Sequence, residues 1–126
     1  MQIQEDLNRL TDRIIGCAIE VHKNLGPGLL EATYETALCM ELSAAGIKFE
    51  KQVGFPVHYK GTKIGEHRID LLVDDSVIVE IKSVERVDPV FDAQVICYLK
   101  VTGKKLGLLI NFNSRLLTKG VKRFVL

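Results

Sequence analysis

Two acidic side chains and a lysine interrupt neighbouring apolar segments of this 126-residue chain. Glu80 and Lys82 stand within the β-branched segment 77–83 (V-I-V-E-I-K-S), and Asp70 lies in the preceding segment 69–73 (I-D-L-L-V). Because side chains alternate across a strand, Glu80 and Lys82 share one face and Val77, Val79 and Ile81 line the other. An unpaired buried charge costs several kcal/mol. These charges must therefore pair, reach water or hold a metal.

The spacing of the acids predicts that they meet across a hairpin. The polar trio 74–76 (D-D-S) is typical of a tight turn, and it separates strands expected at 64–73 and 76–82. Folding back at this turn brings Asp70 opposite Glu80, with Lys82 close by. Carboxylate oxygens are the ligands that Mg²⁺ prefers, so the sequence predicts a divalent-metal site in outline. A structural ion pair between Glu80 and Lys82 is the alternative.

Several motifs resemble those of one nuclease superfamily. Asp70 followed by Glu80-Ile81-Lys82 resembles the D…(D/E)-x-K signature of the PD-(D/E)XK nuclease superfamily. Upstream, segment 28–34 (G-L-L-E-A-T-Y) resembles the motif of the small GxxExxY proteins assigned to that superfamily. Downstream, segments 94–98 (Q-V-I-C-Y) and 106–112 (L-G-L-L-I-N-F) fit the same branch. The resemblance covers nearly the whole chain.

The resemblance implies a set of metal ligands. Asp70 and Glu80 would hold the ion, with the backbone carbonyl of Ile81 as a further ligand. The implied ion is Mg²⁺, for which Mn²⁺ substitutes, and the implied partner is nucleic acid, with DNA expected. The residue before Asp70 is Ile69, so the proline of the superfamily's name is absent. Proline is not a ligand there, and its loss leaves the metal chemistry available.

Three further residues receive catalytic roles from the resemblance. Lys82 would orient or deprotonate the attacking water, or stabilise charge on the phosphate. Glu31 would face the metal cleft, and Gln94 would position Lys82 or the scissile phosphate. From position alone, Glu31 is equally an acid favoured by the dipole in the first turn of a helix. Tyr34, on the same helix face, is equally a core residue.

The apolar periodicity predicts an α/β protein with one mixed sheet. Helices are expected at about 3–24, from residue 29 to Gly46, and from Asp88-Pro89, an N-cap followed by proline, to Gly103. Strands are expected at 47–59, 64–73, 76–82 and 106–112, with a short last strand in the tail. The resemblance implies a restriction-endonuclease-like core (α-α-β-β-β-α-β), its mixed sheet flanked by helices. At this length we expect one domain spanning 1–126.

Composition and cysteine usage exclude several other classes. Hydrophobic residues make up 47% and charged residues 26%, and no apolar run approaches the roughly 20 residues of a membrane span, so we expect a cytoplasmic protein. Cys17, Cys39 and Cys97 stand singly in helical patterns, which indicates buried free thiols. The three histidines lack an i, i+4 pair, which argues against a zinc site.

The charge distribution leaves a second function open. A net charge of only +1 argues against high-affinity nonspecific binding to nucleic acid. Basic residues nevertheless crowd the last quarter of the chain (Lys100, Lys104, Lys105, Arg115, Lys119, Lys122, Arg123). A noncatalytic module with a nuclease fold could use this segment to bind nucleic acid or a protein. A homodimer would supply two active sites, but the sequence leaves the oligomeric state open.

Overall fold

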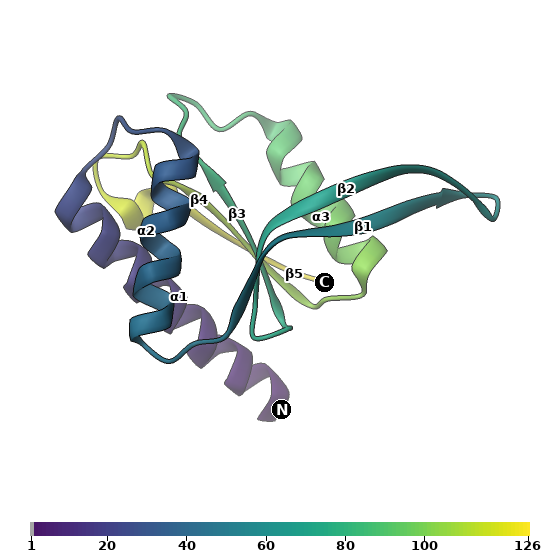
Figure 1. The fold of residues 1–126 in the computed structure, drawn as a ribbon, viewed down its shortest axis with the longest axis horizontal. Helices are drawn as coiled ribbons and strands as arrows, with labels where there is room; N and C mark the ends of the chain where they lie inside the picture. Colours follow the sequence, from purple (N-terminus) through teal and green to yellow (C-terminus); the bar gives the residue numbers. More distant parts are fainter. Residues whose placement is uncertain (1) are drawn as a thin grey trace.

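The computed structural model describes residues 2–126 as a mixed five-stranded sheet with helices on both faces (Figure 1). The elements, in chain order, are α1 (Gln2–Leu25), α2 (Glu31–Ala44), β1 (Phe49–Tyr59), β2 (Thr62–Val73), β3 (Val77–Lys82), α3 (Pro89–Thr102), β4 (Leu106–Asn111), the 3-10 helix η1 (Leu117–Gly120) and β5 (Val121–Val125). The α/β, restriction-endonuclease-like arrangement is confirmed, and the tail does add a last strand.

The strands lie in chain order across the sheet, β1-β2-β3-β4-β5. All neighbours pair antiparallel except β3 and β4, which are parallel. A parallel pair needs a crossover connection, and α3 supplies it. Asp88 begins this helix by accepting a hydrogen bond from the Val90 N–H, and Gly103 ends it at φ +76°. Both ends are where the N-cap acid and the glycine predict them.

Two hydrophobic clusters pack the opposite faces of the sheet. On one face, Val77, Val79 and Ile81 of β3 pack with buried residues of α1 and α2. On the other face, Ile78 packs with Val95 and Leu99 of α3. The apolar face of β3 is therefore the one that alternation predicts. Glu80 and Lys82 follow Ile78 at even positions, which directs them toward the α3 face.

The β1–β2 hairpin extends beyond the rest of the sheet, and we call residues 51–68 the arm (Figure 1). At the root of the hairpin, Phe49 and Leu71 pack against the α1–α2 cluster, whereas Phe55 and Ile69 farther out belong to the α3 cluster. All four positions are odd, so simple alternation would keep them on one face. The hairpin changes face between them, where Gln52 adopts a left-handed backbone with φ 51°.

Three local details differ from the sequence prediction. The first strand begins at Phe49 rather than at residue 47. It is an edge strand, and its register shifts between Val57 and His58. Cys39 is buried, whereas Cys97 is exposed, so the expectation that all three thiols are buried was wrong. Within residues 2–126, no helix is long and apolar enough to cross a membrane.

Candidate active site

Asp70 and Glu80 meet where β2 and β3 separate. The backbone pairing of these strands stops at Leu71 and Val79, one residue short of the two acids. Their side chains continue the contact: Glu80 Oε2 accepts a hydrogen bond from the Asp70 N–H at 2.9 Å, and Asp70 Oδ2 accepts one from the Ile81 N–H at 2.8 Å. The hairpin thus brings the acids together as the spacing indicates.

Burial makes Glu80 a strongly perturbed acid. Its residue is only 6% exposed. The pKa of Glu80 is raised from 4.5 to about 8, chiefly by burial and then by the nearby Asp70 carboxylate, against the lowering effects of the Asp70 N–H and of Lys82. The same two acids, after burial, raise the pKa of Tyr98 on α3. This region therefore disfavours additional negative charge and favours a proton or a cation.

A small pocket lies between Asp70 and the start of α2. Glu31 Oε2 accepts a hydrogen bond from the Ser83 N–H at 3.2 Å, at the end of β3. The Gln52 amide donates to Glu35 Oε1 at 2.9 Å and lies 3.5 Å from Asp70 Oδ1. Burial raises the pKa of Glu35, and Asp70 adds to this effect. The pocket measures about 210 Å³ and is lined by Glu31, Ala32, Glu35, Gln52, Asp70 and Ile81.

Lys82 turns toward α3 instead of pairing with Glu80. Its ammonium lies 4.3 Å from the centre of the Phe91 ring, in cation–π geometry. No ion pair between Lys82 and Glu80 forms in the described chain, so the structural ion-pair alternative was wrong. Gln94 is half-buried on α3, and its side-chain amide makes no hydrogen bond with another residue of 2–126.

The tyrosine of the G-x-x-E-x-x-Y segment is a core residue that organises the loop before α2. Tyr34 is 0% exposed and stacks on Phe112, with ring centres 4.6 Å apart. Its hydroxyl donates to the Gly26 carbonyl and accepts from the Leu29 N–H at 3.1 Å. Ser83 Oγ in turn donates to the Leu29 carbonyl at 2.6 Å. Tyr34 and Ser83 together fix the segment that leads into Glu31.

Sequence reasoning missed three residues at this site: Gln52, Phe91 and Ser83. Gln52 lies within an expected strand, and its left-handed backbone becomes visible only in the structure. Phe91 matches the apolar pattern of its helix, so nothing distinguishes it from a core residue. Ser83 follows the E-x-K segment directly, and a polar residue ending a buried strand was the one available signal.

The oxygen donors at this position fit a hard divalent cation. Asp70 and Glu80 contribute carboxylates, and Glu31 and Glu35 lie across the adjacent pocket. Within residues 2–126, no three Asp, Glu, His or Cys side chains converge closely enough to hold a metal by themselves. Mg²⁺ usually takes one or two protein carboxylates and fills its other positions with waters and phosphate oxygens. The neighbouring carboxylates of Asp70 and Glu80 therefore suit this ion.

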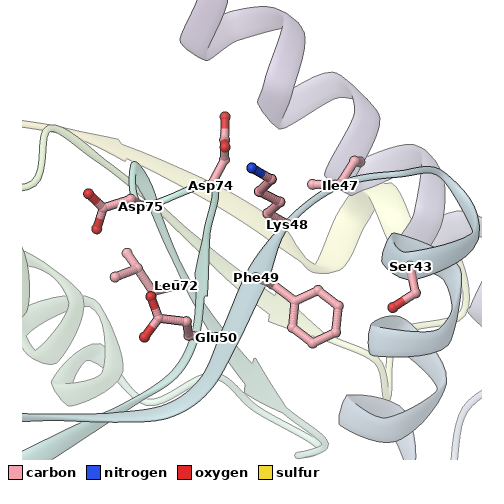
Figure 2. Close-up of a pocket in the computed structure, with 8 residues that line it drawn as sticks. All are labelled: Ser43, Ile47, Lys48, Phe49, Glu50, Leu72, Asp74 and Asp75. Carbon is pink, nitrogen blue, oxygen red and sulfur yellow. The ribbon is translucent and has the colours of Figure 1, made fainter.

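A larger hollow of about 680 Å³ lies at the other end of the sheet strands that carry the acids (Figure 2). It opens between the start of β1 and the β2–β3 turn, with Lys48, Glu50, Asp74 and Asp75 among its lining residues. Asp70 and Glu80 lie away from it, at the opposite end of the β2–β3 pairing. Size alone therefore does not mark the site.

The family model of the PD-(D/E)XK nuclease superfamily matches residues 8–124. This match spans nearly all of the described chain and includes Asp70, Glu80 and Lys82. Among curated proteins, none matches the sequence significantly. The superfamily suggests nuclease activity and nucleic-acid binding, and its nucleases generally use divalent metals. With its mixed sheet, flanking helices and family match, the chain belongs to the PD-(D/E)XK nuclease superfamily.

Proposed function

We propose that this protein is a Mg²⁺-dependent nuclease of the GxxExxY branch that hydrolyses phosphodiester bonds in DNA. The observation that carries the proposal is the Asp70–Glu80 pair at the separating ends of β2 and β3, with Lys82 two residues farther along β3. The proposal treats residues 1–126 as one nuclease domain.

Asp70, Glu80 and the carbonyl of Ile81 would hold the cation. When bound, a divalent ion neutralises phosphate charge and lowers the pKa of a bound water. The chain must supply the anionic oxygens, so Glu80 has to release the proton that burial favours. Asp70 Oδ2 accepts a hydrogen bond from the Ile81 N–H, and this contact keeps the side chain oriented.

Lys82 is proposed to orient the attacking water or to stabilise negative charge on the phosphate. Its contact with Phe91 holds the ammonium on the α3 side of the strand end. Gln94, on the same helix, has an amide available to a phosphate oxygen. Glu31 is proposed to act across the pocket from Asp70, anchored by the Ser83 N–H.

The noncatalytic alternative relies on the basic C-terminal segment, and part of that segment is paired. Lys122 forms an ion pair with Asp92 at 2.7 Å, and Lys104 forms one with Asp75 at 3.2 Å. Arg123 also contacts the side chain of Asn8. These contacts reduce the positive charge available to a ligand. The Asp70–Glu80 site therefore supports nuclease chemistry better than the C-terminal segment supports simple binding.

Calorimetric titration with Mn²⁺ tests the metal site without a chosen substrate. The wild-type protein should bind saturably, and Asp70→Asn should abolish binding because it removes one of two anionic anchors. Asp74→Asn is the matched control, since it makes the same chemical change at the exposed β2–β3 turn. Equal binding by wild type and Asp70→Asn would overturn the site.

Cleavage of DNA with Mg²⁺ tests the activity itself. Both Asp70→Asn and Lys82→Ala should abolish cleavage by the purified protein, whereas Asp74→Asn should retain it. Cleavage that survives both site substitutions would not come from this site. Saturable metal binding together with inactivity on single- and double-stranded DNA would reject the DNA nuclease.

A further inference from the structure

The outer part of the arm is an exposed two-stranded ribbon. Residues 58–64 are all exposed, and β1 and β2 pair with one another out to Tyr59 and Thr62 (Figure 1). The closing turn has only two residues, Lys60 at φ 48° and Gly61 at φ 81°. Two successive positive φ angles are typical of a type I′ turn, which matches the twist of a hairpin. The tip is therefore narrow and well defined.

The arm carries the excess positive charge of the chain. Residues 51–68 contain four basic side chains, Lys51, Lys60, Lys63 and Arg68, and one acid, Glu66, which forms an exposed ion pair with Lys63 at 3.6 Å. The arm is therefore formally +3. Because the whole chain is +1, the remainder is −2. Arg68 is exposed and, within the described chain, forms no ion pair with the nearby Asp70.

Lys60 occupies a position that turn chemistry gives to other residues. The first central residue of a type I′ turn is preferentially Asn, Asp or Gly, because other side chains meet a steric penalty at positive φ. A lysine there places a cation at the apex of the arm despite this penalty. Its ammonium lies 5.5 Å from the centre of the exposed Tyr59 ring, beyond both hydrophobic clusters.

Two apolar side chains accompany the charges at the tip. Tyr59 is 60% exposed and Ile64 is 64% exposed. The register pairs His58 with Lys63 and Val57 with Gly65, so Ile64 is an extra residue without a partner across the ribbon. Such a bulge increases the local twist and redirects the side chain. The tip thus combines cations with exposed apolar groups on a two-stranded ribbon.

We propose that the arm is a recognition element that enters the major groove of double-stranded DNA, with Lys60 and Lys63 on backbone phosphates. The major groove of B-DNA is about 12 Å wide and admits a two-stranded β-ribbon, whereas the major groove of A-form RNA is too narrow for side chains to read. This inference rests on the proposed nuclease function and adds duplex DNA as its substrate.

The position of the tip relative to the site sets the footprint. Eight residues separate Thr62 from Asp70 along β2, which corresponds to about 26 Å at roughly 3.3 Å per residue. One strand of DNA advances 3.4 Å per nucleotide, so the tip contacts the duplex about seven or eight base pairs from the phosphate at the site. A duplex shorter than this distance cannot engage both.

The test combines Lys60→Asn with Lys63→Gln and measures binding to fluorescent duplex DNA over a range of salt concentrations, with Ca²⁺ in place of Mg²⁺. Each phosphate contact contributes roughly 0.9 to the slope of log K against log salt, so the double variant should lower that slope by about 1.8. Lys60→Asn also creates the Asn-Gly turn that hairpins prefer, so its melting temperature should match or exceed that of the wild type. Weaker binding by a double variant that melts no lower than the wild type could not come from misfolding.

Lys23→Gln with Lys119→Gln is the matched control. These exposed lysines lie on α1 and η1, on the side of the molecule away from the arm (Figure 1), and their loss changes the net charge equally. The control should keep the wild-type slope on duplex DNA. An equal reduction by both double variants would overturn the arm as the specific contact. So would an equal loss of affinity for duplex RNA and duplex DNA in the arm variant.

Failure of this proposal is distinguishable from failure of the nuclease proposal. If the arm variant binds duplex DNA as the wild type does and both cleave DNA with Mg²⁺, the arm proposal is wrong and the nuclease proposal stands. If the arm variant loses binding but the wild type never cleaves DNA, the arm proposal stands and the nuclease proposal fails.

Discussion

At the scale of single residues, Glu80 links the chemistry of the site to the stability of the fold. Its pKa is about 8 in the folded protein, raised by burial from the ordinary 4.5. Between these values the folded state keeps a proton that the unfolded state releases, so stability is present at low pH and is lost as pH rises. A divalent ion bound as proposed would reverse this preference, because it would replace the proton.

We therefore expect the free energy of unfolding of the metal-free protein to fall as pH rises from about 5 to about 8. Denaturant titrations in EDTA across this range measure the effect. Glu80→Gln should flatten the dependence, because its amide does not titrate. Glu66→Gln on the exposed arm is the control and should leave the dependence as in the wild type. A Glu80→Gln profile that parallels the wild type would contradict the assignment.

Phe91 offers a second prediction at this scale. Replacing it by leucine keeps apolar volume on α3 but removes the ring face under Lys82. A cation–π contact is worth about 0.5–2 kcal/mol, so kcat for DNA cleavage should fall roughly two- to thirtyfold if the contact holds Lys82 in place. Mn²⁺ affinity should not change. Phe91→Tyr preserves the ring and should retain kcat; equal losses in both variants would point to packing instead.

At the scale of elements, the loop before α2 depends on one hydroxyl. Tyr34→Phe preserves the stacking on Phe112 but removes the partner of the Gly26 carbonyl and the Leu29 N–H. Losing such partners typically costs about 1–3 kcal/mol, so the midpoint of chemical denaturation should fall accordingly. Mn²⁺ affinity should fall much less than in Asp70→Asn. A Tyr34→Phe protein as stable as the wild type would show that the loop is held in another way.

The order of helices and strands was predictable because local signals agree with the fold. The 88–89 N-cap and proline, the glycines at 46 and 103, and the alternation in β3 each act over a few residues. Asp70 and Glu80 were predictable for the same reason, because a short hairpin fixes which residues face each other. The change of face at Gln52 was not, because it depends on how β1 and β2 coil together and pack on α3.

Contacts between distant segments were the part of the site that local patterns could not predict. Lys82 lies on Phe91, and Gln52 reaches Glu35 across 17 residues of sequence. Neither contact leaves a periodicity in the chain. The prediction of a structural ion pair between Glu80 and Lys82 was wrong for a related reason. Adjacency on one strand face does not reveal that the Phe91 ring on α3 contacts the lysine instead.

At the scale of the whole molecule, opposite charges are separated along one hairpin. The root of the hairpin holds Asp70 beside Glu80 and faces Glu31 and Glu35, whereas the arm, residues 51–68, is formally +3. A polyanion would therefore meet attraction at the arm and repulsion at the root. Cation binding at the root removes that repulsion, so the two proposals predict that duplex DNA and the divalent ion strengthen each other's binding.

The two carboxylates at the end of the β2–β3 pairing also give the site a built-in spectroscopic reporter. The Asp70 and Ile81 amide protons are bonded to side-chain oxygens, Glu80 Oε2 and Asp70 Oδ2. Their exchange with deuterated solvent therefore depends on where those oxygens point, while exchange at Leu71 or Val79 depends on the sheet. Comparing these amides in one protein sample separates rearrangement of the acids from opening of the fold.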